Sequence, residues 1–137
     1  MAAADCIFCR IIAGEMPSHK VMETGQVLAI MDIHPASEGH TLVIPKRHCE
    51  SVYDIEAEDM QAVALAARRI AAAIRAELSP DGLTVTQANG VAAGQTVMHY
   101  HVHLIPRSAG ERVRFHGQQA ADSKRLAVLA RAFAARL

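Results

Sequence analysis

The sequence lacks an excess of charge of either sign. It carries 14 basic and 14 acidic residues, so its formal net charge at pH 7 is zero. Proteins that attract nucleic acid or an anionic membrane through their overall field have a basic surface, and none is expected here. We therefore expect no nucleic-acid partner and no membrane partner, and any recognition of phosphate must be local.

Long uncharged apolar runs are also absent. The longest stretch with helical periodicity is charged throughout, so no transmembrane helix is expected. The opening residues, MAAADC, show neither the basic region nor the apolar core of a signal peptide. Cysteine is scarce and odd in number, at three residues, which without a leader favours a reducing compartment. We therefore expect a cytoplasmic protein.

What the sequence does contain is enough apolar material for one core. The chain has 137 residues, of which 51% are hydrophobic, and it shows no repeat, low-complexity tract or long linker. A length of this order predicts one domain, spanning residues 1–137.

Periodicity predicts an α+β fold with a mostly antiparallel sheet. Strands are expected within residues 20–33 (two strands around Gly25), 39–45, 83–89 and 96–106. Helices are expected at 6–13, at 126–137 and, most strongly, at 55–78, where Met60, Val63, Ala67, Ile70, Ile74 and Leu78 form one stripe.

Three histidines alternate in the stretch HYHVHLIP, at positions 99, 101 and 103. Side chains on a strand alternate between faces, so His99, His101 and His103 share one face and Tyr100 and Val102 face the core. Three interpretations compete: a polar sheet surface, a metal site and a catalytic site.

The metal interpretation is limited by spacing, and the preceding loop favours catalysis. Alternate residues of a strand lie about 6.6 Å apart, so two rings can converge on one ion but three cannot without distortion. The loop NGVAAGQT is small and bounded by glycines, which lets backbone N–H groups approach an anion. An imidazole beside a phosphate site suits nucleophilic attack on phosphorus, with a phosphohistidine as the product.

The segment GQTVMHYHVHLIPR resembles the signature of the histidine triad (HIT) family, and CIFCRIIAGEMPSHKV and LAIMDIHPASEGHTLVIPKRH match the family in order and spacing. The resemblance is strongest to the Hint-like branch of purine-nucleoside phosphoramidases. It implies a HIT-like α+β fold with a five-stranded antiparallel sheet, one long helix and short terminal helices. It also implies a homodimer, and hydrolysis or transfer at the α-phosphate of a purine nucleotide such as AMP or an AMP conjugate.

The resemblance implies roles for individual residues. His101 is the nucleophile, His103 contacts the α-phosphate, His99 orients His101 through its backbone carbonyl, and His40 supports the triad. Asp32 holds the ribose hydroxyls. The remaining nucleotide-binding positions are Phe8, Ile11, Ile33 and Leu42 around the base, and Asn89, Gly94, Gln95, Thr96 and Val97 at the phosphate.

Simpler interpretations stay open for some of these residues. Phe8 and Ile11 have the spacing of ordinary core packing on a short helix, and Asp32 has the position of a turn residue. The chain also departs from the family pattern, because Ala88 stands where many members have an asparagine beside the phosphate. This departure puts the role of the neighbouring Asn89 in doubt.

Cys6 and Cys9 form a C-x-x-C pair, which in a reducing compartment suggests a metal or redox site. A thioredoxin-like role needs a preceding strand, which is absent here. The resemblance implies a structural zinc ion bound by Cys6, Cys9, His48 and His99, with no organic cofactor; the competing interpretation is two buried thiols.

The sequence leaves three functions open. The first is a nucleotide phosphoramidase that works through a covalent nucleotidyl-histidine. The second is a dinucleoside polyphosphate hydrolase with the same site, and the third is a non-enzymatic protein that binds nucleotide or zinc.

Overall fold

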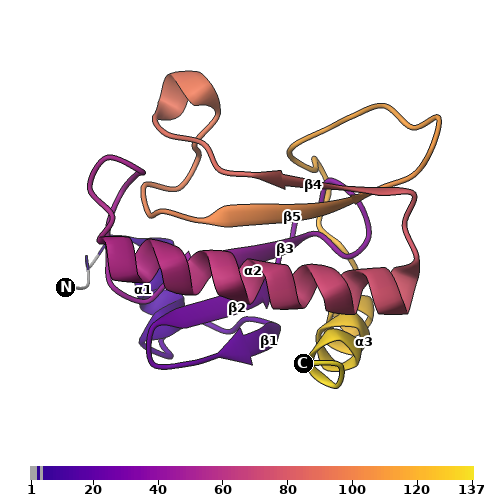
Figure 1. Cartoon of the computed structure of the whole chain (residues 1–137), viewed down its shortest axis with the longest axis horizontal. Coiled ribbons are helices and arrows are strands. Elements are labelled where there is room, and N and C mark those ends of the chain that lie inside the picture. The colour runs from indigo at the N-terminus through magenta and orange to yellow at the C-terminus, as the bar shows by residue number, and fades with distance from the viewer. Residues whose placement is uncertain (1–2, 4) are drawn as a thin grey trace.

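The computed structural model of the chain describes residue 3 and residues 5–137 (Figure 1). Residues 1, 2 and 4 lie outside the described residues. They belong to the opening stretch MAAADC, for which no signal peptide is expected. The helices are α1 (Ile7–Ile12), α2 (Ala57–Leu78) and α3 (Ser123–Ala134), with a 3₁₀ turn at Val91–Ala93. The strands are β1 (Lys20–Glu23), β2 (Val27–Met31), β3 (Thr41–Pro45), β4 (Gly82–Thr86) and β5 (Val102–Arg107).

The five strands form one sheet in the order β1-β2-β3-β5-β4, and every neighbouring pair is antiparallel. This confirms the predicted five-stranded antiparallel sheet with one long helix and short terminal helices. The pairing of β3 with β5 places Leu42 opposite His103. Opposed residues of an antiparallel pair lie on the same face, so His103 shares the face of Leu42, and β5 lies next to β3, the middle strand of the sheet.

The two faces of the sheet hold two separate apolar clusters. On one face Ala29, Met31, Val43 and Leu104 pack with residues of α2 and α3, and α2 runs across this face in the foreground of Figure 1. On the other face the alternate residues Leu28, Ile30, Leu42 and Ile44 pack with Phe8 and Ile11 of α1. The period of two in β2 and β3 therefore separates a structural face from the face that carries the histidines.

Helix α2 begins two residues later than the sequence predicts. The backbone of Glu56 is extended, with φ −69° and ψ 143°, so the helix starts at Ala57. Val63, Ile70 and Ile74 of the predicted stripe are buried, whereas Met60 near the start of the helix is 39% exposed. The helix ends where Ser79 takes a left-handed conformation, with φ 46°.

The predicted strand over residues 96–106 is wrong in its first half, because β5 begins at Val102. The carbonyl of Pro45, at the end of β3, accepts a hydrogen bond from Nε2 of His99 at 2.7 Å. A side chain thus occupies the position where a longer strand would place a backbone amide. The alternation of faces persists, because Tyr100, Val102 and Leu104 all lie in the core cluster beneath α2.

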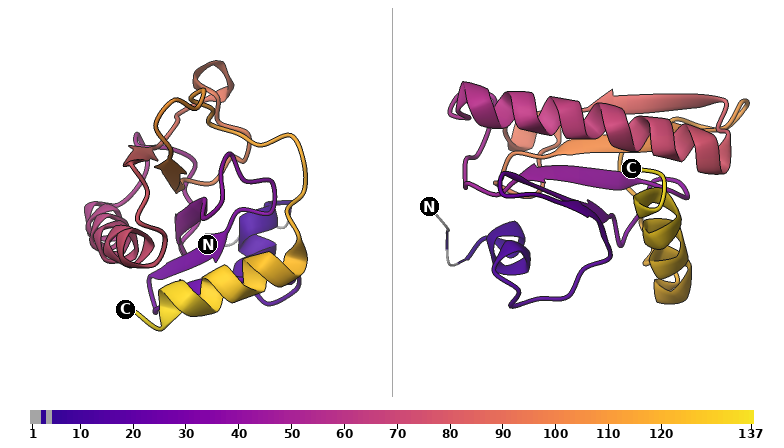
Figure 2. Two further views of the ribbon diagram at one scale, coloured as in Figure 1. Left: turned by 90° about the vertical axis from the view of Figure 1, so that its right-hand side faces the viewer. Right: turned by 60° about the horizontal axis from the view of Figure 1, so that its bottom comes forward.

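Residues 108–122 form a long connection between β5 and α3, which we call the strap. Two backbone hydrogen bonds fasten it to the loop after β2, from Gly117 N to His34 O (3.1 Å) and from Ala121 N to Ile33 O (2.9 Å). The views in Figure 2 show the strap on the way to α3. In the described part of the chain, no helix is both long and apolar enough to cross a membrane.

Candidate active site

A cavity of about 460 Å³ opens on the α1 side of the sheet, within the size range of small-molecule sites. Nine of the predicted nucleotide-binding residues line it: Phe8, Ile11, Asp32, Ile33, Leu42, Thr96, Val97, His101 and His103. Most of the residues in its wall are apolar, and the polar side chains of Asp32 and His103 lie close together, within 4.8 Å of each other. The structure therefore places the predicted base and ribose residues, and part of the predicted phosphate residues, around a single hollow.

His101 is buried at the floor of this cavity, and its backbone surroundings fix its tautomer. Its Nδ1 lies 2.7 Å from the carbonyl oxygen of His99. A carbonyl can only accept, so Nδ1 carries the proton and Nε2 keeps a free lone pair. Burial lowers the pKa of His101, although the hydrogen bond to His99 opposes that effect. The ring is therefore neutral at pH 7 and can act as a nucleophile.

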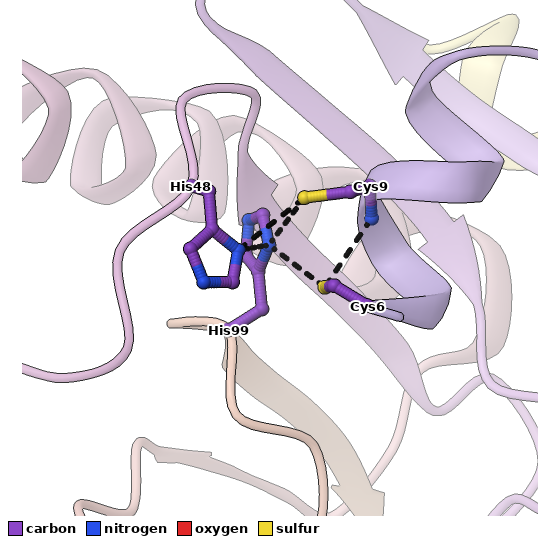
Figure 3. Close-up of side chains that lie close together, drawn as sticks. All are labelled: Cys6, Cys9, His48 and His99. Atoms are coloured by element: carbon purple, nitrogen blue, oxygen red, sulfur yellow. Dashed lines mark hydrogen bonds between the residues drawn. The ribbon is translucent and has the colours of Figure 1, made fainter. Parts of the chain in front are cut away.

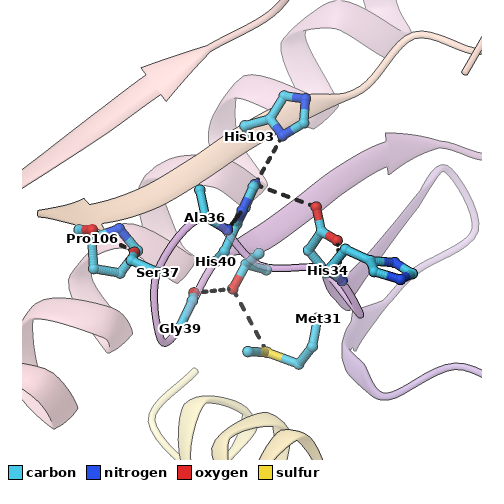
Figure 4. A network of polar contacts seen from close by, with 10 residues as sticks. Met31, His34, Ala36, Ser37, Gly39, His40, His103 and Pro106 are labelled. Carbon is cyan, nitrogen blue, oxygen red and sulfur yellow. Dashed lines mark hydrogen bonds and ion pairs between the residues drawn. The ribbon is translucent and has the colours of Figure 1, made fainter. Parts of the chain in front are cut away.

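A second chain of hydrogen bonds fixes the tautomers of His40 and His103 (Figure 4). The backbone N–H of Ala36 donates to Nδ1 of His40 at 2.9 Å, so the proton of a neutral His40 lies on Nε2. That Nε2 is 2.9 Å from Nδ1 of His103, which must then accept. His103 consequently carries its proton on Nε2 and can donate it to a ligand.

Burial keeps both of these rings neutral. It lowers the pKa of His40 to about 4 and that of His103 to about 3, with smaller contributions from neighbouring histidines. Both side chains are almost inaccessible, at 0% and 7% exposure. At neutral pH the pair is thus a directed hydrogen-bond relay that ends in an N–H group on His103.

Asp32 lies at the rim of the cavity, directly after β2. Its Oδ1 accepts the backbone N–H of His34 at 2.8 Å, and its Oδ2 is 3.5 Å from Nε2 of His40. Burial raises the pKa of this carboxyl group, an effect partly offset by the His34 N–H. The turn interpretation accounts for Oδ1, while Oδ2 remains available to a hydroxyl donor in the cavity.

The predicted phosphate loop divides into two parts. Thr96 and Val97 line the cavity, but Asn89, Gly94 and Gln95 do not. The Asn89 amide oxygen accepts the N–H of Val52 at 2.7 Å. The Gln95 amide donates to Glu50 O (2.6 Å) and accepts from Gly90 N (2.7 Å). The side chains of Asn89 and Gln95 therefore hold the loop in place, and their contact with a nucleotide stays a prediction.

Cys6, Cys9, His48 and His99 form a compact cluster beside the cavity (Figure 3). The two imidazoles face each other through their Nδ1 atoms at 3.1 Å. The Sγ–Nδ1 distances are 3.4 Å for Cys6–His99, 3.5 Å for Cys9–His99 and 3.3 Å for Cys9–His48. The first helix and the segment before β5 are thus brought together by donors of the kind that bind zinc.

These distances fit one tetrahedral ion. Zn–N bonds of about 2.0 Å and Zn–S bonds of about 2.3 Å give donor–donor edges of roughly 3.3–3.8 Å, close to those observed. His99 has the required tautomer, because its Nε2 donates to Pro45 O and its Nδ1 is left bare. Burial also lowers the pKa of His99 to about 4, so the bare nitrogen stays available.

Several residues of the cavity were missed by sequence reasoning. His116 and Gly117 of the strap line it, as do Met16, Pro17, Ser18 and His34. The strap residues have no periodic pattern, and His116 lies 13 positions beyond His103 (116 − 103). No local signal in the sequence connects them with the site.

Comparison with known proteins places the same segments in one family. The sequence model of the HIT domain matches residues 13–110. The chain is 52% identical over 105 residues to protein hit of Bacillus subtilis, covering 77% of this chain and 72% of that protein. It is 44% identical over 104 residues to the adenosine 5'-monophosphoramidase of Saccharomyces cerevisiae, covering 76% of this chain and 63% of that enzyme.

Solved structures give the same result. A Hit-like protein from Bartonella henselae, crystallised with an unknown ligand, superposes with a TM-score of 0.92 at 37% identity and full coverage of both chains. A zinc-bound histidine triad family protein from Mycobacterium smegmatis superposes with a TM-score of 0.84 at 37% identity, covering 96% of this chain and 92% of that one.

Proposed function

Because this chain belongs to the HIT-domain family, we propose that it is a nucleotide phosphoramidase acting at the α-phosphate of AMP-linked substrates. The membership confirms the resemblance seen in the histidine segment. The yeast phosphoramidase among its relatives supports nucleotide hydrolysis as the general activity. The choice of substrate and the covalent mechanism are our proposal.

The observation that carries this proposal is the orientation of His101. Its Nδ1–H is held by the His99 carbonyl at 2.7 Å, and its ring lines the cavity. The Nε2 lone pair is therefore the reactive atom. When Nε2 bonds to phosphorus the ring becomes positively charged, and the carbonyl dipole that already holds Nδ1–H stabilises this charge.

The cavity has a suitable group for each part of a nucleotide. Phe8, Ile11 and Leu42 supply an apolar slot for a purine, and Asp32 supplies an acceptor for the ribose hydroxyls. Thr96 and the Nε2–H of His103 supply donors for the phosphate. These contacts orient the phosphorus over His101, which is the usual source of much of an enzyme's rate advantage.

The proposed reaction has two steps. In the first, Nε2 of His101 bonds to the α-phosphorus as the phosphorus–nitrogen bond to the leaving amine breaks, and the amine takes up a proton from solvent. In the second, water bonds to phosphorus and gives up one proton to solvent as the bond to His101 breaks, which releases AMP and restores the neutral imidazole. His103 donates to the phosphoryl oxygen in both steps.

We also propose a structural zinc ion on Cys6, Cys9, His48 and His99, supported by the fit of the donors and by the zinc-bound relative. When bound, the ion supplies a rigid cross-link and no chemistry at phosphorus. His99 is itself the link to catalysis, since its side chain belongs to the cluster while its carbonyl holds His101.

Substitution of His101 tests the covalent mechanism. His101→Ala should reduce turnover of an AMP-amide by several orders of magnitude while AMP affinity and melting temperature change little, because the ring forms the bond that the reaction needs. Single-turnover kinetics and calorimetric AMP binding would measure both quantities. Turnover comparable to that of the wild type would rule out the covalent step.

A substrate comparison separates the alternatives. The wild type should hydrolyse an AMP-lysine amide with a higher kcat/KM than a diadenosine polyphosphate. The reverse order would identify a dinucleoside polyphosphate hydrolase. Tight AMP binding without turnover of either substrate would identify a non-enzymatic binder.

A further inference from the structure

His116 belongs to the cavity but to none of the segments that resemble the family signature. It lies on the strap and lines the hollow together with Asp32, His101 and His103. Its ring stands edge-to-face against the ring of His103, with centroids 5.8 Å apart and planes at 85°. His116 is exposed to solvent, whereas His103 is buried, with 7% of its surface exposed. The two rings therefore approach the same space, one from the sheet and one from the strap.

The strap holds His116 in this place through contacts on both sides of it. Phe115 lies over the guanidinium of Arg107, 5.4 Å from ring centroid to Cζ, a cation–π distance. Gly117 donates its N–H to His34 O at 3.1 Å. A Cβ at position 117 would overlap the carbonyl oxygen of Pro35, so a side chain there would push the strap outward. The position of His116 is thus a built feature of the fold.

A phosphate bound in the cavity needs hydrogen-bond donors, and the described lining offers few of them. Among its described residues, the lining contains no lysine and no arginine. His101 and His103 are almost fully buried, at 6% and 7% exposure, and their hydrogen bonds to the His99 carbonyl and to His40 leave one lone pair and one N–H donor to face a ligand. Asp32 adds an acceptor at the rim that repels an anion. Within the described residues, His116 makes no hydrogen bond that would engage its ring nitrogens, so an N–H is free to donate.

From this geometry we infer that His116 is a phosphate-binding residue, which donates from the strap to the same α-phosphate that His103 contacts from the sheet. The inference rests on the proposed function, because it takes a nucleotide as the ligand. It predicts that the strap distinguishes a nucleotide from a nucleoside. The apolar slot and Asp32 contact the base and the ribose in both ligands, so His116 should affect only the phosphorylated one.

Calorimetric binding of AMP and of adenosine to the full chain tests this inference. The wild type should bind AMP more tightly than adenosine. His116→Ala should weaken AMP binding about tenfold, as expected for the loss of one hydrogen bond to a charged group, and should leave adenosine binding within about twofold. His116→Gln keeps an N–H donor of similar reach and should recover part of the loss.

Two further variants separate the effect of the His116 side chain from a general effect on the strap. One is a neutral control, and the other moves His116 without replacing it. Gln118→Ala changes an exposed neighbour on the same strap that does not line the cavity, and it should leave both affinities unchanged. Gly117→Ala keeps the imidazole but displaces the strap, and it should reproduce the selective loss of AMP binding. Melting temperatures identify any variant that fails to fold.

The possible outcomes are distinct. Equal weakening of AMP and adenosine by His116→Ala would overturn the inference in favour of a structural role, and no change in either would overturn it in favour of a surface residue. If AMP does not bind the wild type, the proposed function fails first and the inference fails with it. If His101→Ala abolishes turnover while His116→Ala leaves AMP binding intact, the function stands and only the inference fails.

Discussion

At the level of single residues, two backbone groups determine which nitrogen of each imidazole faces the ligand. The His99 carbonyl leaves Nε2 of His101 with a free lone pair, and the Ala36 amide leaves His103 as a donor through His40. Three chemically identical side chains thus acquire different roles from single contacts. A change at Ala36 that removes its N–H, such as replacement by proline, would act on His103 without touching it.

Asp32 should distinguish ribose from deoxyribose. A carboxylate oxygen left without its hydroxyl partner costs about 1–3 kcal/mol, so kcat/KM should be higher for a ribonucleotide than for its 2'-deoxy analogue. Asp32→Ala should erase most of this preference. Measuring both substrates on both proteins, with melting temperatures, checks it. A variant that keeps the full preference would mean that Asp32 is only the turn residue indicated by its bond to His34.

The stability of the fold should fall as the pH drops below about 6.5. The pKa of His40 is lowered from 6.5 to about 4 and that of His103 to about 3, so in this window the unfolded chain binds protons that the folded chain excludes. The stabilisation is complete above pH 6.5 and is lost as the pH falls towards these lowered values. At about 1.36 kcal/mol per pKa unit, the lowered pKa values correspond to about 3 kcal/mol for His40 and about 5 kcal/mol for His103.

The variant His40→Asn checks this assignment. Its free energy of unfolding, measured by urea titration between pH 4 and 7 beside the wild type, should depend less on pH. The raised pKa of Asp32 acts in the opposite direction at the acid end, but it is present in both proteins. If the free energy of unfolding of the variant depends on pH as strongly as that of the wild type, groups other than His40 bind these protons.

Residue types with a fixed chemistry are what the sequence predicts well at this scale. His101, His103 and Asp32 all line the cavity, because His101 directly precedes β5, His103 lies within it, and Asp32 directly follows β2. The tautomers could not be predicted, since they depend on the carbonyl of His99 and the amide of Ala36. The same holds for Gln95, whose amide holds Glu50 and Gly90 instead of facing the cavity.

At the level of elements, α1 is the least self-sufficient part of the fold. It has six residues, far fewer than an isolated helix needs for stability in water. Phe8 and Ile11 pack it on the sheet, and Cys6 and Cys9 tie its start to His48 and His99. The ring of Phe8 also packs edge-to-face against the ring of His101, with the two ring centroids 5.1 Å apart. The position of this helix therefore affects the shape of the cavity.

Removal of either cysteine should therefore loosen α1. Cys6→Ser or Cys9→Ser should lower the zinc content of protein purified without added zinc or chelator, and should lower the melting temperature more than it lowers AMP affinity. Cys49→Ala is the matched control, because Cys49 is buried outside the cluster. A native protein without zinc and with unchanged stability in the variants would leave Cys6 and Cys9 as plain core residues.

The sequence predicts elements where one periodicity runs without competition. The stripe of α2 shows this, because Val63, Ile70 and Ile74 are all buried. Prediction from periodicity fails for the first half of the predicted strand at 96–106, where apolar and polar residues alternate but the partner strand has already ended. Whether an alternating segment is paired depends on its neighbour in the sheet, here on Pro45 and its carbonyl.

At the level of the whole molecule, β4 and α2 leave an unpaired region. β4 is an edge strand, Val85 on it is 58% exposed, and Leu65 of α2 is 65% exposed. A hollow of about 460 Å³ lies between them, lined by Ala72, Arg75 and Leu83 among others. An exposed edge strand beside an apolar helix face invites pairing with a copy of itself, and we propose a two-fold dimer through this region.

Light scattering should give about 29 kDa, twice the 14.7 kDa of one chain, and the value should persist on dilution. Val85→Lys places a charge on the edge strand and should shift the protein towards the monomer. Val128→Lys, at an exposed valine of α3, should leave the mass unchanged. A monomeric wild type at micromolar concentration would contradict the proposed dimer.

The course of the strap is the part of the architecture that the sequence does not predict. Its path depends on tertiary contacts: the close approach of Gly117 to Pro35 and the placement of Phe115 over Arg107. These contacts have no periodic signature, in contrast to the alternation that identified β2, β3 and β5. The position of an irregular segment that packs against distant residues cannot be predicted from local sequence patterns.

The separation of the cysteine–histidine cluster along the chain has a consequence for the order of events in folding. Cys6 and His99 are 93 positions apart, and they meet only when β5 has joined β3 and α1 has reached the opposite face. During synthesis, the first two donors leave the ribosome long before the last. The proposed zinc ion can therefore gain its full set of ligands only in a late kinetic phase, after the slow closure of a long loop. Stopped-flow refolding followed by a zinc-release dye would record this delay as a lag between sheet formation and metal uptake.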